Sequence, residues 1–315
     1  MALKIPRLGL FPLTAGLTAG GHLGIGGCDT VALAAEYGTP LYVFDEATLR
    51  GQCAEFRTGF GQRYADSLVL YAGKAFLGRD LLHLLREAGL GLDVVSGGEL
   101  GIARAAGFPL ERVYFHGNNK SDAELVMGLE WGIGRFVVDN FSELARLDRL
   151  AGERGAAPGI LLRLTPGVDP HTHQYISTGV VDSKFGFTWA RAAEAVVQAM
   201  SAGNLNLVGL HFHLGSLIFE TEPYRTAIDL VLNFAAEMKA QHGFELGELN
   251  VGGGFAVQYT VDTPAPPAAA YAGVIAPLVT ATCRKLGLAL PRLVVEPGRA
   301  IVGQAGVALY RVGVV

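Results

Sequence analysis

The hydrophobic and polar positions of this chain follow two alternating periods from residue 67 onward. Short runs of β-branched and aliphatic residues, typical of buried strands, alternate with longer segments in which apolar residues recur every three or four positions. The first run, SLVLYAG, precedes the helical segment RDLLHLLREAGLG. The pattern predicts strands at residues 67–73, 91–96, 112–117, 135–140, 159–166, 207–215, 248–254 and 292–298.

Helical segments separate these strands. Ser121 and Glu124 form a capping-box pattern at the start of one of them. The expected helices span residues 47–61, 79–91, 121–132, 141–155, 188–203, 223–243 and 271–287. Eight strands alternating with helices predict an α/β fold, a TIM-like (β/α)8 barrel, which typically takes about 250 residues. The alternative, a doubly wound open sheet, would need a phosphate loop after its first strand, and GKAFLGRD does not resemble one.

The two ends of the chain differ from the barrel pattern. We expect residues 1–45 to form the N-terminal part of a β-domain. The apolar stretch at their start could pass for a signal peptide, but prolines and glycines interrupt it. Residues 46–299 form the predicted barrel, and residues 300–315 the start of a C-terminal β-domain. The chain stops within that last stretch, so we expect a C-terminally truncated sequence.

Composition narrows the possible partners. The chain is 50% hydrophobic and 17% charged, with a net charge of −4 and no block of like charge. Nucleic acids and acidic membrane surfaces are therefore poor candidates, and no apolar run is long enough to span a bilayer. Three widely spaced cysteines predict no disulfide framework and favour a reducing cytoplasm.

Polar or charged residues end nearly every predicted strand. In barrel enzymes the active site lies at the carboxyl ends of the strands, so these residues should converge on one mouth. They are Lys74, Asp93–Ser96, His116–Asn118, Asp139, Arg163, His211, His213, Gly252–Gly254 and Glu296–Arg299.

Two loops offer groups for binding an anion. Gly252–Gly254 follow the seventh strand, where the backbone N–H groups of barrel proteins often hold a phosphate, although three glycines also fit a simple tight turn. After the eighth strand, Pro297 and Gly298 form a turn that should present Glu296 and Arg299 at the mouth. A surface salt bridge is the alternative, which the buried strand before them makes less attractive.

His211 and His213 lie two residues apart on the sixth strand and should point to the same side. An HxH pair suggests metal ligation, whereas the alternative is one packing histidine and one functional histidine. Since the first strand ends in Lys74 rather than in metal ligands, we expect no metal.

Lys74 has the residue type needed for carbonyl chemistry. Burial favours the neutral amine, which is a nucleophile toward aldehydes. A lysine, a phosphate loop and a carboxylate such as Glu296 together match pyridoxal 5'-phosphate, whose ring accepts electrons best when its nitrogen is protonated.

The motifs extend this match along the chain. YAGKAF, LDVVSGGEL, FHGNNKSDAEL, RLTPGVDPHTHQYISTG, DSKFGF, LHFHLGS, NVGGGF and EPGRAIVGQAG together closely resemble the diaminopimelate decarboxylases. These belong to the barrel-type (fold type III, alanine racemase-like) pyridoxal phosphate decarboxylases, together with ornithine, lysine and arginine decarboxylases. HGNNKSD and THQYISTG favour diaminopimelate as substrate.

The resemblance implies a role for each residue. Lys74 would form the Schiff base with the cofactor, His213 would stack on its ring, and Glu296 would pair with the ring nitrogen. The remaining cofactor set is Asp93 and Arg163, which would orient the site, Ser216 with Gly252, Gly253 and Gly254 at the phosphate, and Gly298 with Arg299, the latter also near the substrate carboxylate. The implied reaction converts meso-2,6-diaminopimelate to L-lysine and CO2, in a cytoplasmic homodimer with shared active sites.

The sequence also departs from the family pattern. Leu217 stands where glutamine is frequent, and Phe76 where asparagine is common. The proton-donating cysteine and a late tyrosine that the family has in its C-terminal domain are not present, so the chain alone would lack full activity. Two alternatives stay open: a non-catalytic barrel paralogue that binds a partner, and a decarboxylase of another diamino acid.

Overall fold

The computed structural model describes residues 7–168 and 184–315. Within them, eight parallel strands form a closed ring, because β8 pairs with β9 in addition to its other neighbour, β7. The predicted (β/α)8 barrel is therefore confirmed. Its strands are β5 (Ser67–Ala72), β6 (Gly91–Val94), β7 (Val113–Phe115), β8 (Arg135–Val138), β9 (Gly159–Thr165), β11 (Asn206–Phe212), β12 (Glu248–Asn250) and β13 (Arg292–Val295). The two-residue strand β10 (Phe187–Thr188) adds to β9.

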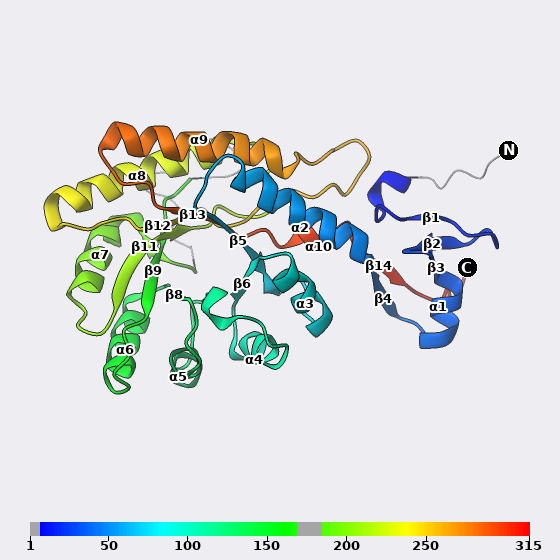
Figure 1. The fold of residues 1–315 in the computed structure, drawn as a ribbon, viewed down its shortest axis with the longest axis horizontal. Coiled ribbons are helices and arrows are strands. Elements are labelled where there is room, and N and C mark those ends of the chain that lie inside the picture. Colours follow the sequence, from blue (N-terminus) through cyan, green and yellow to red (C-terminus); the bar gives the residue numbers. More distant parts are fainter. Residues whose placement is uncertain (1–6, 169–183) are drawn as a thin grey trace.

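Helices surround the barrel on its outside (Figure 1). They are α2 (Glu46–Gly61), α3 (Arg79–Glu87), α4 (Gly97–Ala105), α5 (Asp122–Trp131), α6 (Phe141–Gly152), α7 (Ala192–Ser201), α8 (Glu222–His242) and α9 (Ala268–Leu286). Short 3-10 turns lie at η1 (Leu8–Leu10), η2 (Gly73–Ala75), η3 (Leu110–Arg112) and η4 (Trp189–Arg191). The capping box predicted at Ser121 is present. Helix α4 was not predicted, because the three glycines in its nine residues weaken the helical pattern, but Ser96 caps its N-terminus.

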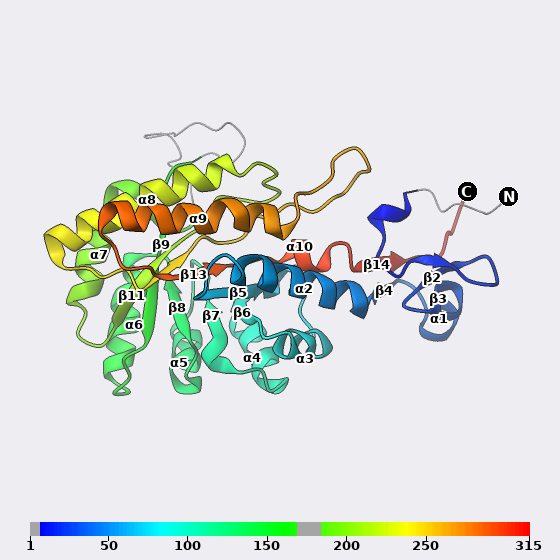
Figure 2. The same cartoon turned by 45° about the horizontal axis from the view of Figure 1, so that its top comes forward.

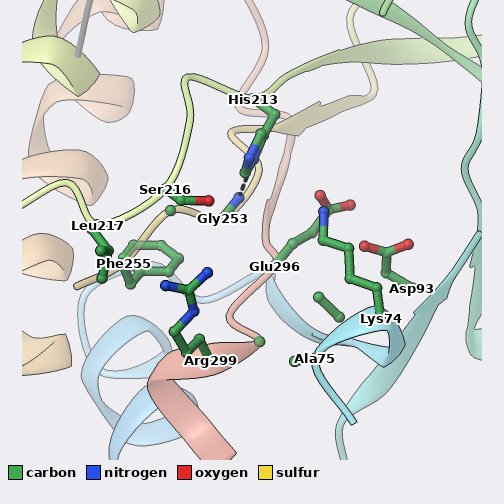
Figure 3. A pocket seen from close by; sticks show the side chains of 13 residues that line it. Lys74, Ala75, Asp93, His213, Ser216, Leu217, Gly253, Phe255, Glu296 and Arg299 are labelled. Atoms are coloured by element: carbon green, nitrogen blue, oxygen red, sulfur yellow. Dashed lines mark hydrogen bonds between the residues drawn. The ribbon is translucent and has the colours of Figure 1, made fainter. Parts of the chain in front are cut away.

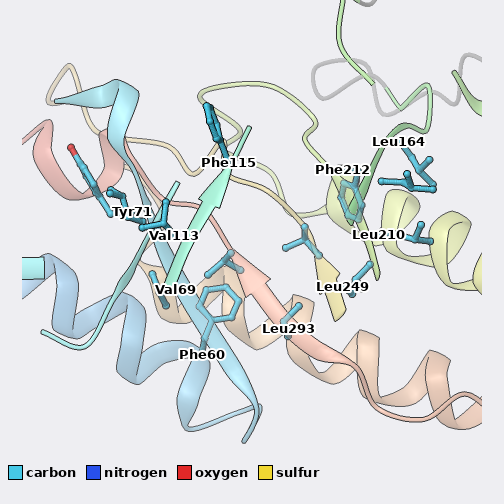
Figure 4. Packing of buried hydrophobic residues seen from close by; sticks show 14 of the residues in the cluster. Phe60, Val69, Tyr71, Val113, Phe115, Leu164, Leu210, Phe212, Leu249 and Leu293 are labelled. Carbon is cyan, nitrogen blue, oxygen red and sulfur yellow. The ribbon is translucent and has the colours of Figure 1, made fainter. Parts of the chain in front are cut away.

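Alternate strand residues build two separate cores. Val69 and Tyr71 of β5 pack against the helices in the large outer cluster, part of which is shown in Figure 4. Leu70, between them, faces the opposite side, because successive side chains of a strand alternate. It belongs to a small cluster that plugs the barrel interior: Leu70, Tyr114, Val137, Leu161 and Val294. Polar side chains from the strand ends therefore sit above an apolar floor.

The first and the last segments that the structure describes, residues 7–45 and 300–315, lie at one end of the molecule, beyond the N-terminus of α2 (Figures 1 and 2). Strands β1 (Gly16–Leu17), β2 (Leu23–Ile25) and β3 (Cys28–Asp29) form an antiparallel sheet, and β4 (Leu41–Phe44) pairs with β14 (Gly306–Leu309). The sequence led us to expect β-structure in both segments, but each also contains a helix. Helix α1 (Thr30–Tyr37), which Asp29 caps, interrupts the first, and α10 (Arg299–Val302) begins the second. Among the described residues, none of the helices has the length and apolar character needed to cross a membrane.

Candidate active site

Lys74 lies just after the first barrel strand, as its position behind the predicted strand 67–73 indicates. Strand β5 ends at Ala72, and the chain turns through η2, which holds Lys74 as its middle residue. The buried Tyr71 hydroxyl donates to the carbonyl of Phe76 at 2.7 Å and so closes this turn. The lysine side chain is exposed rather than buried, and it extends into a cavity toward Glu296 (Figure 3).

The cavity has a volume of about 220 Å³ and collects most of the predicted cofactor residues. Those that line it are Lys74, Asp93, His213, Ser216, Gly253, Gly254, Glu296, Gly298 and Arg299. Arg163 lines an adjoining cavity of about 550 Å³, which shares Lys74, Asp93, His213 and Glu296 with the first. The structure thus brings residues from six different strand ends to one place.

The glycine run after β12 packs too closely against its neighbours to accept side chains. Gly254 has φ +99°, and a Cβ there would lie 2.6 Å from the carbonyl oxygen of Gly215. A Cβ on Gly253 would lie 2.2 Å from the carbonyl oxygen of Glu296. Glycine is therefore required by close approach of three loops as well as by backbone conformation.

Two of the amides that were expected to face a phosphate already have partners. The N–H of Gly252 donates to Oδ1 of Asn250 at 2.9 Å, and the N–H of Gly253 donates to Nδ1 of His213 at 3.2 Å. We therefore expect a bound anion to rely more on Ser216 and Arg299, which line the same cavity, than the sequence suggested.

His213 is held as a neutral imidazole. Since its Nδ1 accepts the Gly253 N–H, we assign the ring proton to Nε2. Burial lowers the pKa of His213 to about 3, and the Lys74 ammonium acts in the same direction. A neutral ring fixed by the glycine loop is suited to stacking against a flat ligand.

Glu296 accepts hydrogen bonds from three buried side chains on three different strands. Its Oε1 lies 2.8 Å from Nε2 of His116 and 2.7 Å from Nδ2 of Asn250, and its Oε2 lies 3.2 Å from Nε2 of His211. Burial would raise the pKa of the Glu296 carboxyl, but the two imidazoles outweigh it and hold the pKa well below its usual range. The carboxylate is therefore a buried anion with a defined orientation.

Sequence reasoning assigned no role to His116 or Asn250 in this network. Both stand at strand ends, in FHGNN and LNVGG, which was the available signal. His211 and His213 face the same cavity, as their spacing predicted, but they do not act as a pair: the first contacts Glu296 and the second contacts Gly253.

Asp93 and Arg163 both line the larger of the two cavities. Asp93 is 3% exposed, and its Oδ1 has no hydrogen-bond partner among the described residues. Burial raises the pKa of Asp93, and His116, 3.9 Å away, opposes that effect. The Arg163 guanidinium stacks 4.5 Å above the ring of Phe185, and burial lowers its pKa against the opposing pull of nearby carboxylates.

Arg299 and Leu217 complete the wall opposite Lys74 (Figure 3). Nη1 of Arg299 donates to the hydroxyl of Tyr259 at 3.0 Å. Leu217 adopts φ +57°, a left-handed conformation that costs a non-glycine residue about 1–2 kcal/mol. The loop after β11 is therefore held in a strained form where it lines the cavity.

These residues fit pyridoxal phosphate. A cation, a hydroxyl, closely packed glycines, the Lys74 amine and two carboxylates all line one cavity. The Oδ1 of buried Asp93 has no partner among the described residues and could accept a hydrogen bond from a donor on the bound ring. The donor set thus offers one partner for each functional part of the cofactor.

Comparison with known proteins supports this fit. Residues 46–303 match the family described as "Pyridoxal-dependent decarboxylase, pyridoxal binding domain". The diaminopimelate decarboxylase of Bacillus subtilis is 45% identical over 295 residues, which cover 93% of this chain and 67% of the relative. This chain belongs to the diaminopimelate decarboxylase family. That of Mycobacterium tuberculosis is 42% identical over 297 residues, covering 92% of this chain and 66% of the relative.

Solved structures of the family share the fold. The diaminopimelate decarboxylase of M. jannaschii superposes with a TM-score of 0.86 at 33% identity, covering 93% of this chain and 68% of that one. That of Helicobacter pylori, in complex with L-lysine, gives 0.78 at 32% identity, covering 88% and 68%. The predicted family, enzyme class and cofactor are thus confirmed. The substrate motif THQYISTG, residues 172–179, lies outside the described residues.

Buried His211 and half-buried His213 predict acid sensitivity for this family member. Burial lowers the pKa of His211 to about 4 and that of His213 to about 3, from ordinary values of 6.5. Below pH 6.5 the unfolded chain therefore binds more protons, and stability falls by up to about 1.4 kcal/mol per pH unit for each histidine until the folded values are reached. Urea unfolding at pH 7 and pH 5 measures this loss. His213→Gln should reduce it and the exposed His242→Gln should not; equal losses in both variants would contradict the assignment.

The run Gly252–Gly254, which we call the glycine cradle, gives a second prediction. Gly254→Ala should cost about 1–2 kcal/mol from backbone strain alone and should weaken cofactor binding further, because the new methyl displaces the carbonyl of Gly215. Gly101→Ala on helix α4 is the matched control, since a Cβ there meets nothing within 4 Å. Thermal unfolding and titration with pyridoxal phosphate should separate the two, and unchanged affinity in Gly254→Ala would show that the cradle does not contact the cofactor.

Proposed function

We propose that this chain catalyses the pyridoxal phosphate-dependent decarboxylation of meso-2,6-diaminopimelate to L-lysine and CO2. The observation that carries the proposal is that Lys74, the Glu296 carboxylate and the glycine cradle share one cavity. Relatives that are 40–45% identical over most of the chain are named for this activity. Lysine, the product, occupies the H. pylori relative.

Lys74 is the residue that would hold the cofactor covalently, through its amine and the cofactor aldehyde. Its exposed side chain reaches the cavity without displacing a buried group. When bound, the cofactor supplies a positively charged ring that delocalises the electron pair left behind as CO2 departs. When it is not bonded to the cofactor, the Nζ of Lys74 would be placed to accept or return a proton.

Glu296 would keep the ring nitrogen protonated. The hydrogen bonds from His116, His211 and Asn250 stabilise the anion and prevent the carboxyl from taking the proton itself. His213 would lie against the ring face. Asp93 and Arg163, which line the adjoining cavity, would orient His213 and Glu296.

Arg299, Ser216 and the loops at Gly252–Gly254 and Gly298 would bind the anionic parts of cofactor and substrate. Arg299 is a fixed cation at the mouth of the cavity, held by Tyr259, and a guanidinium pairs well with phosphate or carboxylate. Gly298 lets its loop approach Ala72, whose Cβ would be 3.0 Å from an added side chain.

We also propose the domain division and assembly expected from the sequence. The pairing of β4 with β14 supports a β-domain built from residues 1–45 and 300–315 beside the barrel of residues 46–299. The chain spans about two thirds of the length of its curated relatives. A cytoplasmic homodimer with shared active sites fits this plan, and analytical ultracentrifugation with and without cofactor tests it.

The substrate is tested by measuring CO2 release from a panel. Incubation with pyridoxal phosphate and meso-diaminopimelate should release CO2 and form lysine in equal amounts, with ornithine, arginine and lysine as competing substrates. Faster release from one of these would support a decarboxylase of another diamino acid. Cofactor binding without release from any of them would favour the non-catalytic paralogue.

A further inference from the structure

Two buried charges next to the site have no part in the proposed chemistry. Lys120, after β7, is 2% exposed, and Glu143, in α6, is 0% exposed. Their Nζ and Oε1 atoms lie 2.7 Å apart. Burying charges costs so much desolvation free energy that an ion pair of this kind adds little net stability compared with apolar residues. Its position therefore calls for another explanation.

The Lys120 ammonium uses all three of its protons to connect two strands. It donates to the carbonyl of Gly117 at 2.8 Å, to the carbonyl of Val137 at 2.9 Å and to Glu143. Gly117 is the second residue after β7, and Val137 belongs to β8. The lysine thus ties the end of one barrel strand to the next.

Glu143 connects the ion pair to the residue that follows β8. Its Oε2 accepts from the backbone N–H of Asp139 at 3.1 Å, directly after β8. The ion pair therefore holds the backbone at the carboxyl ends of the adjacent strands β7 and β8. Its bonds fix the peptides, not the side chains, of the residues at the barrel mouth.

His116 receives the effect of this arrangement. It precedes Gly117, whose φ of +119° is readily adopted by glycine and whose carbonyl is held by the Lys120 ammonium at 2.8 Å. From this position the Nε2 of His116 reaches Oε1 of Glu296 at 2.8 Å. A small rotation of the peptide would move the imidazole and lengthen that bond.

We propose that Lys120, together with Glu143, is a positioning residue that acts on Glu296 through His116. The ammonium keeps the end of β7 in place, His116 then holds one oxygen of Glu296, and the carboxylate stays oriented in the cavity. The proposal rests on the proposed function only in that Glu296 serves the cofactor.

The test replaces the pair without leaving a lone buried charge. Lys120→Met/Glu143→Met preserves volume and removes the bonds to Gly117, Val137 and Asp139. Glu143→Gln is a second variant, which removes the negative charge but keeps an acceptor for the ammonium. Glu248→Gln is the matched control, because Glu248 is also 2% exposed and paired with Arg135 at 3.3 Å, but lies at the opposite end of the barrel.

Two measurements follow each variant. Nitrogen-15 NMR of the cofactor-free chain reports the His116 Nε2–H hydrogen bond, and absorbance titration gives the pyridoxal phosphate affinity. In the Met pair we expect the His116 proton resonance to lose its hydrogen-bonded shift and the affinity to fall about tenfold, within the range for residues of one hydrogen-bond network. Glu248→Gln should change neither, whatever it does to melting temperature.

A double-mutant cycle identifies the route. If Lys120 acts through His116, the Met pair should weaken cofactor affinity no further in a His116→Asn background. Additive losses, or an unchanged His116 resonance in both the Met pair and Glu143→Gln, would overturn the proposal. A wild-type chain that binds no cofactor would instead contradict the proposed function, while the NMR comparison would still decide the positioning role.

Discussion

Lys74→Ala should lose covalent cofactor binding and reduce decarboxylation by about 10²–10⁴-fold, the range for removal of a group that transfers protons, with a further loss from weaker binding. The side chain lies in the cavity and makes no hydrogen bond that supports the fold among the described residues, so the variant should unfold at nearly the wild-type temperature. The measurements are the absorbance of bound pyridoxal phosphate and CO2 release.

Lys285→Ala is the control for this variant, since Lys285 is an exposed lysine on the outer helix α9. It should keep both the cofactor absorbance and the turnover. If Lys74→Ala retained the absorbance of lysine-bound cofactor, another amine would have to hold it, and the interpretation of the cavity would be wrong.

Glu296→Gln should keep the cofactor but lower turnover by about 10²–10³-fold, as expected when an electrostatic partner of the reacting group becomes neutral. The glutamine carbonyl can still accept from His116 and Asn250. Its NH2 group would face the N–H of His211, which must shift to its other tautomer. Because Nδ1 of His211 has no partner among the described residues, this shift is possible but leaves a buried N–H unpaired.

Turnover and the pH dependence of the cofactor absorbance measure this effect. The ring nitrogen should lose its proton at a lower pH in Glu296→Gln than in the wild type. Glu248→Gln, with an equally buried carboxylate at the other end of the barrel, is the control and should leave the absorbance unchanged. Full turnover in Glu296→Gln would show that the carboxylate does not stabilise the reacting ring.

Sequence reasoning located the barrel because its evidence is local. Each strand, and each outer helix except the glycine-rich α4, is visible within a few residues, and the chain order places every strand end at the same mouth. Lys74, Glu296 and the glycines were found for this reason. The same reasoning put Lys74 at the end of a buried strand, whereas the closing turn that Tyr71 secures moves it into the open cavity.

The hydrogen-bond network around Glu296 could not be predicted in the same way. It joins side chains from β7, β11, β12 and β13, so it depends on the register and twist of strands that are far apart in sequence. Likewise, the residues around His213 in the sequence do not show that its Nδ1 accepts the Gly253 N–H, which is then not available to a phosphate. Residue types at strand ends indicate which groups meet, while only the fold shows which of them bond.

The most direct test of the central claim is to locate the cofactor on the chain. Loading with pyridoxal phosphate, reduction with borohydride and peptide mass spectrometry should find one pyridoxyl group per chain, on Lys74. A group on another lysine, such as the buried Lys120, or no modification at all under conditions where the protein is folded, would contradict the account.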